Sequence, residues 1–554
     1  MLSPPASADG QAGRGVQATQ AGHAPDLVLE PWLGTEVRCY ANRVRTIVEA
    51  LDRAVRLFPD RVALEVPEGD VTYADLAELV EGAAERLAEE GLRRGDRLAV
   101  CLPNGLDIVV AIWACARAGL VFVGLSTRLQ PPQWAYMLRH SGASLALGAP
   151  EHLDGVRRAA AEAGMRAEAA RPVGDHLTGR RRPWKGESIP FPSEDDVYGV
   201  IYTSGTTGRP KASQLAHRGT MHSATAYVRT LNLTADDRTA IVFPLFYITG
   251  HVAQVTPMML VGGTCVPVSD LVPRDFVRLI GERRITYLMV VPSLWPLLLR
   301  TPEFRWPDLA HVEIGAFGGS PVPLSTITAL RQRMPQLRLY DAYGLTETHS
   351  PATCLLDAEF RRKPGSVGRP LPCADVRVVD DDGCDLPTGE AGELWIRGPM
   401  VTPGYFGDPE ATAAAITDGW LHTGDLARLD DEGYVYILDR KKDMISRGGF
   451  KVYSVELEYL LVSHPDIAEA AVFGVPDRLA FEAVAAYVVP AAGRTVEAST
   501  VQAWVAENMA DYAVPRFVRV VDTILRNRTG KVDKVGLRAE LVAELEASGR
   551  RGAP

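Results

Sequence analysis

The sequence lacks several features that mark particular classes of protein. It contains no uninterrupted apolar run of about 18 residues, so no membrane-spanning helix is predicted. Acidic residues outnumber basic ones, and the net charge of −10 does not favour binding to nucleic acid or to an anionic membrane. The seven cysteines form neither CxxC pairs nor a metal-ligand spacing. These absences favour a cytoplasmic protein with reduced thiols and no integral membrane association.

Length and composition divide the chain into parts. With 554 residues it is too long for one core, because domains usually span about 100–200 residues. Residues 1–30 are rich in Ala, Gly, Pro and Ser and lack the apolar segment of a signal peptide. We therefore expect a disordered tail over residues 1–40, and a second tail over residues 546–554.

Between these tails, strand-like and helix-like segments alternate. Strands are expected at 97–105, 197–203, 240–246, 286–291 and 312–317, and helices at 45–57, 73–90, 218–230, 273–283 and 322–333. This succession predicts an α/β fold whose largely parallel sheets carry helices on their faces. The large N-terminal domain should span residues 41–438 and end in a small β-subdomain after residue 375, where short strands alternate with Gly and Asp turns.

A charged segment, DRKKD at 439–443, follows this domain and is predicted to be a hinge. Residues 444–545 have a helix and strand pattern of their own. Their elements are expected at 453–463, 467–475, 483–489 and 497–510. The pattern predicts a small, mobile α+β domain behind the polar hinge.

The strongest local motif is YTSGTTGRPK at residues 202–211, which overlaps the end of the strand-like VYGVIYT. Its glycines allow a tight turn, and its hydroxyl groups and the Lys211 ammonium can donate to phosphate oxygens. The motif predicts a phosphate-binding loop, with a flexible connection as the alternative. Its Gly-to-Lys spacing differs from that of a Walker A loop, and no GxGxxG dinucleotide motif occurs.

This loop resembles the signature loop of the adenylate-forming superfamily, which includes acyl-CoA synthetases, luciferases and the adenylation domains of nonribosomal peptide synthetases. Further matches follow in the family's order: GGSP at 318–321, DAYGLTE at 341–347, WLHTGD at 420–425, DRKKD at 439–443 and NRTGK at 527–531. The resemblance implies an enzyme that activates a small aryl or acyl acid with ATP as acyl-AMP, releases pyrophosphate, and transfers the acyl group to coenzyme A.

The resemblance also implies which residues bind ATP. They are Thr203, Ser204, Gly205, Thr206, Thr207, Gly208, Lys211, Gly318, Gly319, Ser320, Asp341, Ala342, Tyr343, Gly344, Asp425, Ile437 and Arg440. Within this set, Tyr343 would stack on adenine, Asp341 would accept from its amino group, and Asp425 would accept both ribose hydroxyls. Glu347 would hold Mg²⁺, a hard cation that prefers oxygen ligands, and Thr346 would contact the α-phosphate. Taken alone, Thr346 and Glu347 could instead cap a helix.

By the same resemblance, catalysis depends on movement of the small domain. Lys531 would bridge the carboxylate and the α-phosphate during adenylation. The small domain would then rotate about a hinge at Lys442 and bring Gly448 and Gly449 beside the tunnel for the pantetheine arm of coenzyme A. One active site would thereby serve two incompatible half-reactions.

Fewer sequence motifs identify the residues of the acyl pocket. The resemblance places it around the helix after PLFYITG, the strand before Gly318 and the segment after Glu347, which provide Phe246, Tyr247, His251, Ala316, Phe317, Leu345, His349 and Ser350. Tyr247 stands where many acyl-CoA synthetases have a histidine gate and is a candidate catalytic residue. Phe317 stands where a small residue is common, which favours a narrow pocket for a short or flat aromatic acid. The alternative is that these aromatic residues fill the core.

The sequence allows more than one acceptor for the activated acyl group. Relatives often have a glycine where this chain has Phe481 and a lysine where it has Ala513, and some relatives have a lysine where it has Ser446. A carrier-protein thiol, an amine, or an aryl amine that receives adenylated nitrite are therefore alternatives to coenzyme A. A non-catalytic protein that keeps the nucleotide-binding fold is a further alternative, and the intact Glu347, Asp425 and Lys531 argue against it.

Overall fold

The computed structural model describes residues 26–186, 192–203, 210–269, 271–292, 294–319, 322, 324–477, 480–491, 493–526 and 532–547. It begins with an antiparallel hairpin of β1 (Leu27–Trp32) and β2 (Thr35–Tyr40). The prediction of a disordered tail as far as residue 40 is therefore wrong for residues 27–40. Residues 1–25 lie outside the described part of the chain.

Buried ion pairs hold this hairpin against the large domain. The side chain of Arg43 is 1% exposed and lies 2.6 Å from Glu30 and 2.8 Å from Glu194. Arg218 contacts the same two carboxylates at 2.7 and 3.0 Å. The hydrogen bond from Arg43 is the main cause that lowers the pKa of Glu30 to about 2. Because Glu194 and Arg218 lie far along the chain, the local composition near the N-terminus does not reveal the hairpin.

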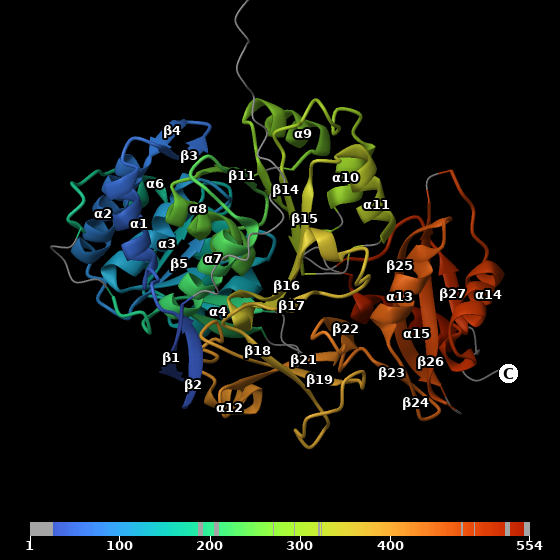
Figure 1. The fold of residues 1–554 in the computed structure, drawn as a ribbon. Coiled ribbons are helices and arrows are strands. Elements are labelled where there is room, and N and C mark those ends of the chain that lie inside the picture. Colours follow the sequence, from blue (N-terminus) through green and yellow to red (C-terminus); the bar gives the residue numbers. More distant parts are fainter. Residues whose placement is uncertain are drawn as a thin grey trace, which may run out of the picture.

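Two large sheets form the body of the large domain (Figure 1). The first has the strand order β10-β9-β6-β5-β7-β8 and is parallel except for β10. Its strands are β5 (Arg97–Cys101), β6 (Val121–Gly124), β7 (Leu145–Gly148), β8 (Ala170–Pro172), β9 (Val197–Thr203) and β10 (Lys211–Ala216). The end of β9 and the start of β10 thus flank the predicted phosphate-binding loop.

The second sheet has the strand order β17-β16-β15-β14-β13-β11-β12-β3-β4. It is parallel from β15 to β3 and has antiparallel strands at both edges. Its strands are β3 (Val62–Val66), β4 (Gly69–Thr72), β11 (Arg238–Ile241), β12 (Thr264–Pro267), β13 (Tyr287–Met289), β14 (Ile314–Gly318), β15 (Arg338–Leu345), β16 (Ser350–Leu355) and β17 (Arg369–Pro370).

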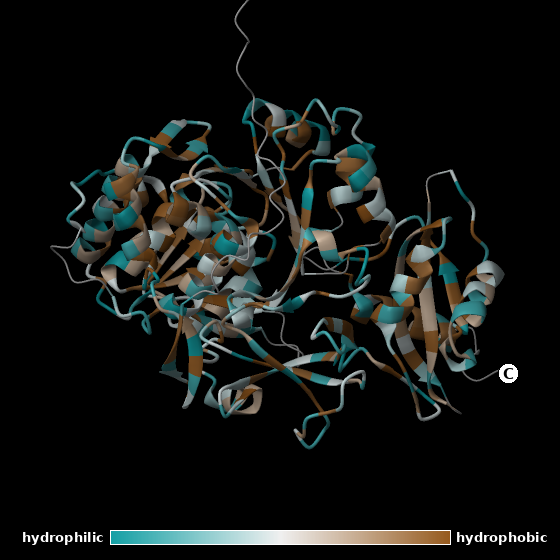
Figure 2. Ribbon diagram, in the orientation of Figure 1, coloured by the Kyte–Doolittle hydropathy of each residue, from teal (hydrophilic) through white to brown (hydrophobic). Residues whose placement is uncertain are grey.

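Helices lie between the two sheets and on their outer faces, which gives five layers. The inner helices share one apolar cluster with both sheets and are α1 (Ile47–Leu57), α2 (Tyr73–Glu89), α3 (Leu106–Ala118), α7 (His217–Leu231) and α8 (Thr256–Val261). The outer helices are α4 (Pro131–Ser141) and α5 (Leu153–Glu162) on the first sheet, and α9 (Pro273–Glu282), α10 (Leu294–Arg300) and α11 (Leu324–Arg333) on the second. The short helix α6 (Gly174–Leu177) contacts α2. Figure 2 shows hydrophobic residues concentrated on the strands and the inner helices.

The chemistry of the sequence explains this layering. The central helix α3 is apolar on nearly all sides, as expected for a helix covered by protein all round. By contrast, the outer helix α9 buries only Phe276, Val277 and Ile280, which lie on one face and pack on the second sheet. The pattern of the sequence therefore places each helix in an inner or an outer layer.

The large domain ends in an antiparallel β-subdomain, and a separate small domain follows. The subdomain contains β18 (Asp375–Val379), β19 (Gly392–Arg397), α12 (Pro409–Ala415), β20 (Ile416–Thr417), β21 (Trp420–Leu429) and β22 (Val435–Arg440). The small domain contains β23 (Ile445–Arg447), β24 (Phe450–Val452), α13 (Ser454–Ser463), β25 (Ile467–Asp477), β26 (Phe481–Pro490), α14 (Ala498–Asn508), β27 (Phe517–Val520) and α15 (Lys534–Ala547). In Figure 1 the small domain lies beside α11.

The predicted α/β architecture is confirmed: a large domain of mostly parallel sheets, a β-subdomain and a small α+β domain. The turn at Glu432 and Gly433 joins β21 to β22, in the region where the sequence predicts short strands that alternate with Gly and Asp turns. All seven cysteines are thiols, and six of them are buried. Within the described residues, no helix is long and apolar enough to span a membrane.

Candidate active site

Three of the predicted nucleotide-binding residues lie at or next to the carboxyl ends of β9, β14 and β15, where open α/β sheets usually bind ligands. Thr203 ends β9, Gly318 ends β14, and Gly344 lies one residue before the end of β15. Lys211 begins β10, and its backbone oxygen accepts a 3.4 Å hydrogen bond from the hydroxyl of Thr203. Ser204, Gly205, Thr206, Thr207, Gly208, Ser320 and Lys531 lie outside the described residues.

Two of these glycines allow an unusually close approach of neighbouring strands. A Cβ atom on Gly344 would lie 1.5 Å from the backbone oxygen of Ser350, and one on Gly318 would lie 2.3 Å from that of Ala342. No side chain fits at either distance, so both positions require glycine. The following residue, Gly319, has φ +82, which also favours glycine.

Asp425 stands at the centre of the predicted ribose site. Its Oδ2 accepts a 2.6 Å hydrogen bond from the phenol of Tyr343, and its Oδ1 lies 2.6 Å from Nε of Arg440. Ile437 packs in the same apolar cluster as Tyr343. The structure thus brings four predicted residues from three strands together. This carboxylate, 4% exposed, can accept hydrogen bonds from sugar hydroxyls.

Asp341 is two residues before Tyr343 on β15, so both side chains point to the same face of the sheet. Burial raises the pKa of Asp341 to about 8. Its carboxyl group is therefore neutral at pH 7, and can both donate and accept a hydrogen bond. The edge of adenine offers an amino donor beside a ring-nitrogen acceptor, so a neutral carboxyl group matches it.

Glu347 and Thr346 form the turn Thr346–Thr348 directly after β15. The phenol of Tyr405 donates a 3.0 Å hydrogen bond to Oε1 of Glu347. The ring of Tyr405 lies 4.8 Å from Nζ of Lys211. One tyrosine, which the sequence did not single out, therefore contacts both the predicted magnesium ligand and the predicted phosphate ligand.

The donor set fits magnesium. In the described part of the chain, no cluster of three or more His, Cys, Asp or Glu side chains could hold a metal. Glu347 would provide a single carboxylate. This suits Mg²⁺, which usually keeps several waters and is bound through substrate phosphates together with one or two carboxylates.

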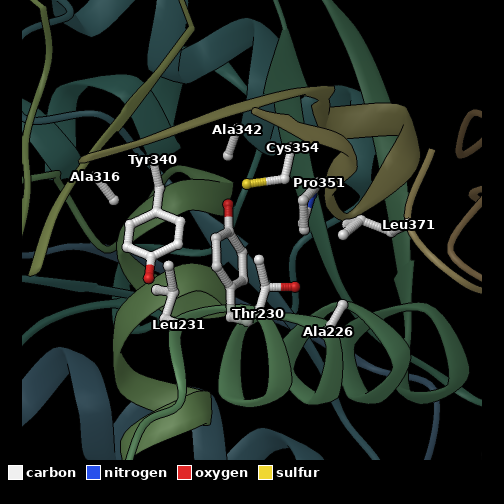
Figure 3. Close-up of a pocket in the computed structure, with 10 residues that line it drawn as sticks. Ala226, Thr230, Leu231, Ala316, Tyr340, Ala342, Pro351, Cys354 and Leu371 are labelled. Carbon is white, nitrogen blue, oxygen red and sulfur yellow. The ribbon is translucent and has the colours of Figure 1, made fainter. Parts of the chain in front are cut away.

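A cavity lies on the face of β14 and β15 that is covered by α7 (Figure 3). Its lining carries no charged side chain and consists of Ala226, Tyr227, Thr230, Leu231, Ala316, Tyr340, Ala342, Pro351, Cys354 and Leu371. Figure 3 shows Tyr340 pointing across the cavity toward α7. The cavity volume is about 10 Å³, which is room for about one water molecule.

Phe317 does not narrow this cavity, so the prediction that it does is wrong. Its ring packs against Trp295 and Phe360 in the core on the opposite face of the sheet. Ala316, its neighbour on β14, points into the cavity. The reason is the alternation of side chains along a strand, which sends neighbouring residues to opposite faces.

Phe246, Tyr247 and His251 lie close in sequence but do not line the cavity. The rings of Phe246 and Tyr247 pack edge to face at 4.8 Å, and the phenol of Tyr247 donates a 3.4 Å hydrogen bond to Ser126. His251 lies in the π-helix Gly250–Val255, and its Nε2 is hydrogen-bonded to the phenol of Tyr198 at 2.7 Å. Burial lowers the pKa of His251 to about 3, so it is a neutral core residue.

His349 and Ser350 connect the turn after β15 to the rest of the site. Nε2 of His349 accepts a 3.1 Å hydrogen bond from the backbone of Ala216, and its Nδ1 donates to the oxygen of Met400 at 2.7 Å. The hydroxyl of Ser350 is 3.0 Å from the phenol of Tyr227, which lines the cavity. Leu345 packs with the β-subdomain core rather than into the cavity. Of the eight predicted pocket residues, Ala316 therefore lines the cavity. Ser350 contacts it indirectly, through its hydrogen bond with Tyr227.

The predicted hinge, residues 439–443, begins with the last two residues of β22 and ends before β23. Lys442 is exposed there, and Gly448 and Gly449 are exposed with φ +60 and +90. Asp439 is buried and accepts a 2.9 Å hydrogen bond from the hydroxyl of Ser454 in α13. The hinge segment is thus bonded directly to the small domain. Its role as an axis of rotation stays a prediction.

Several residues of the site had no clear signal in the sequence. Tyr405 lies 58 residues from Glu347, and no spacing rule links the two. Tyr227 and Leu231 lie one helical turn apart on α7, a spacing that is also typical of a core-facing helix. Ala342 was assigned to ATP binding, yet its side chain lines the cavity.

The chain belongs to the AMP-binding enzyme family. Residues 51–406 match the model of the AMP-binding enzyme, and residues 456–531 match the model of the AMP-binding enzyme C-terminal domain. These two regions lie within the large domain and the small domain described above, on either side of the predicted hinge. The predicted membership of the adenylate-forming superfamily is confirmed.

Curated relatives share most of their length with this chain. A feruloyl-CoA synthase of Amycolatopsis sp is 35% identical over 487 residues, covering 88% of this chain and 97% of the relative. An indoleacetate–CoA ligase of Aromatoleum aromaticum is 35% identical over 504 residues, covering 89% and 98%. The predicted enzyme class, an AMP-forming acid–CoA ligase that uses ATP, Mg²⁺ and coenzyme A, is confirmed.

Solved structures agree with the fold. ATP-bound MatB from Rhodopseudomonas palustris matches with a TM-score of 0.81 at 29% identity, covering 89% of this chain and 98% of that one. The amide bond synthetase McbA from Marinactinospora thermotolerans matches with a TM-score of 0.80 at 29% identity, covering 89% and 99%. The same architecture therefore occurs in a protein named for forming amide bonds.

Proposed function

We propose that this ligase activates a small, flat aryl monocarboxylic acid and transfers it to coenzyme A. The choice of acid rests on the cavity between α7 and β15. Its lining has no charged side chain, so a second carboxylate or an ammonium group on the substrate would be buried without a partner. Amino acids and dicarboxylic acids are therefore poor candidates.

The small volume and the uncharged lining of the cavity support a small acid. Ala316 and Ala342 line it from neighbouring strands of the sheet. Tyr227 and Tyr340 contribute aromatic residues to the lining. Because the cavity holds only about one water molecule, any acid must displace lining side chains, and a small acid displaces fewer of them than a long chain does. The feruloyl and indoleacetate relatives are named for aryl acids, which agrees with this choice.

The first half-reaction follows from the placement of charges. A carboxylate oxygen attacks the α-phosphorus of ATP, the bond to pyrophosphate breaks, and pyrophosphate leaves. The protein supplies no nucleophile and acts by positioning and by charge. Lys211 would contact phosphate oxygens, Thr346 the α-phosphate, and Asp425 the ribose. Mg²⁺, held by Glu347, would neutralise negative charge on the phosphates.

In the second half-reaction the thiolate of coenzyme A attacks the carbonyl carbon, and AMP leaves. By family resemblance, Lys531 acts in the first step, and Gly448 and Gly449 face the acceptor in the second. The need for ATP and coenzyme A, together with the reduced cysteines, supports a cytoplasmic location.

An amine acceptor is the second candidate, and three residues favour it. Phe481 is 77% exposed with φ +63, where relatives often have glycine. Ala513 is buried and Ser446 is uncharged, so this chain lacks the lysine that relatives often have at the first position and some have at the second. A neutral amine needs these cations less than the phosphates of coenzyme A do.

Product analysis tests the proposal. The enzyme is incubated with ATP, Mg²⁺ and, in turn, benzoate, cinnamate, hexanoate, hexadecanoate, succinate, phenylalanine and nitrite, with coenzyme A, with an aryl amine, or with neither. We expect pyrophosphate release with the aryl acids and an aryl-CoA thioester by mass spectrometry. Greater activity on hexadecanoate than on the aryl acids would contradict the choice of acid. An amide formed in preference to the thioester would contradict the choice of acceptor.

A further inference from the structure

The segment 402–406 lies between the strand that leaves the phosphate-binding loop and the turn that carries Glu347. The backbone of Gln214 donates a 3.0 Å hydrogen bond to Gly404, and the backbone of Phe406 donates a 2.8 Å hydrogen bond to Ala212. Between these two bonds, Tyr405 forms an antiparallel β-bridge with Ser213 of β10. The backbone of Tyr405 is therefore fixed against the strand that begins at Lys211.

The same segment is bonded to the turn after β15. The backbone of Thr402 donates a 2.7 Å hydrogen bond to the oxygen of Glu347. The hydroxyl of Thr402, which is 1% exposed, lies 2.8 Å from the oxygen of Gln214 and 3.0 Å from that of Gly404. These bonds connect the two halves of the phosphate site through one short piece of chain.

The side chain of Tyr405 completes this connection. Its phenol donates to one oxygen of Glu347 at 3.0 Å, and its ring lies 4.8 Å from Nζ of Lys211. We infer that Tyr405 is a positioning residue that holds the Glu347 carboxylate and the Lys211 ammonium at the separation that Mg²⁺ and the ATP phosphates require. The inference rests on the use of Mg²⁺ and ATP in the proposed function.

Tyrosine suits this role for chemical reasons. A phenol occupies one lone pair of the carboxylate, so the carboxylate keeps its charge and further lone pairs for a metal. An aromatic ring attracts an ammonium group without neutralising it. A carboxylate at this position would instead pair with Lys211, and a lysine would pair with Glu347. Tyr405 orients both groups and leaves both charges available to the ligand.

Equilibrium binding tests this role without knowledge of the acid. ATP binding is measured by isothermal titration calorimetry over a series of Mg²⁺ concentrations for the wild-type protein, Tyr405→Phe and Tyr405→Leu. We expect Tyr405→Phe to raise the half-saturating Mg²⁺ concentration roughly five- to tenfold, because the carboxylate loses its orienting hydrogen bond. Tyr405→Leu, which also removes the ring, should in addition weaken ATP binding at saturating Mg²⁺.

Two controls separate positioning from stability. Tyr436→Phe removes a phenol that donates to Asp430 at 3.3 Å outside this segment, and it should leave the Mg²⁺ dependence unchanged. In a Glu347→Gln background, Tyr405→Phe should have no further effect on the Mg²⁺ dependence, since the two residues act through one contact.

The outcomes are distinct. A folded Tyr405→Phe protein with unchanged Mg²⁺ dependence would overturn the inference, and so would an equal effect of the substitution in both backgrounds. If the wild-type protein itself binds no ATP with Mg²⁺, the proposed function fails, and this inference fails with it. A lower melting temperature for Tyr405→Phe without any shift in Mg²⁺ dependence would assign Tyr405 to the stability of the fold alone.

Discussion

The phenol of Tyr343 and the carboxylate of Asp425 form a 2.6 Å hydrogen bond, although they lie 82 residues apart in the chain. Tyr343 belongs to the second large sheet, and Asp425 belongs to the β-subdomain. Arg440 contacts the other carboxylate oxygen at 2.6 Å. The surface expected to stack on adenine and the acceptor expected to bind ribose are therefore fixed relative to each other.

This geometry predicts how the ribose is recognised. Asp425→Ala should weaken ATP binding by roughly 10- to 100-fold, because it removes the charged acceptor for the ribose hydroxyls and the carboxylate that Arg440 contacts. The sharper test compares ATP with 2′,3′-dideoxy-ATP by calorimetry. Wild-type protein should prefer ATP, and Asp425→Ala should bind both nucleotides equally. If the variant kept the wild-type preference, Asp425 would not be the ribose ligand.

The raised pKa of Asp341 predicts how stability depends on pH. Its pKa is about 8 in the folded protein and 3.8 ordinarily, so the folded state binds this proton more tightly. The resulting stabilisation is complete below about pH 4 and is lost as pH rises toward 8, by up to about 1.4 kcal/mol per pH unit. The nearby groups that interact with this carboxyl are Tyr227, Cys354 and Tyr459, whose raised pKa values keep them neutral over this range.

Asp341→Asn tests this effect, because it keeps the shape of the side chain and removes its titration. The free energy of unfolding is measured by chemical denaturation from pH 5 to pH 8.5. Wild-type protein should lose stability relative to the variant as the pH rises. Parallel curves for the two proteins would show that Asp341 titrates normally.

Ala316 and Phe317 are neighbours on β14 that face opposite sides of the sheet, so substitutions at the two positions should change different properties of the enzyme. Ala316→Val adds methyl groups to the cavity and should raise KM for aryl acids about tenfold or more. Phe317→Leu should lower stability by about 1–1.5 kcal/mol and leave the preference among acids unchanged, because Phe317 packs on the far face. The measurement is kcat/KM for benzoate and hexanoate. A change of acid preference in the Phe317 variant alone would reverse the assignment.

Lys531 tests the two half-reactions separately. Lys531→Ala should abolish pyrophosphate release, while transfer of the acyl group from a synthetic aryl adenylate to coenzyme A should be far less affected. Stopped assays of each step provide the comparison. Equal loss of both steps would contradict a small domain that presents different faces to the two reactions.

Local motifs explain why much of the site could be predicted. Gly318, Gly344 and Asp425 each belong to a short contiguous match, and the structure places them at strand ends or in a shared hydrogen-bond group. Most helix and strand positions were predictable for a similar reason, since amphipathic periods are local. The strand expected at 240–246 is an exception, because β11 ends at Ile241. The boundaries of α1 and α7 differ from the expected ones by one or two residues.

What the sequence did not reveal depends on register and on distant contacts. Ala316 and Phe317 were both placed in the pocket, but neighbours on a strand cannot face the same side. Tyr405 gains its role only because its segment is bonded both to β10 and to the turn of Glu347. In both cases the decisive information is tertiary, and no local pattern carries it.

The most direct test of the central claim follows one oxygen atom. A substrate aryl acid labelled with ¹⁸O in its carboxylate is incubated with the enzyme, ATP, Mg²⁺ and coenzyme A, and the AMP is analysed by mass spectrometry. If the carboxylate attacks the α-phosphorus and the thiol then displaces AMP, each AMP carries one labelled oxygen. Unlabelled AMP, or label recovered in inorganic phosphate, would contradict the formation of an acyl adenylate.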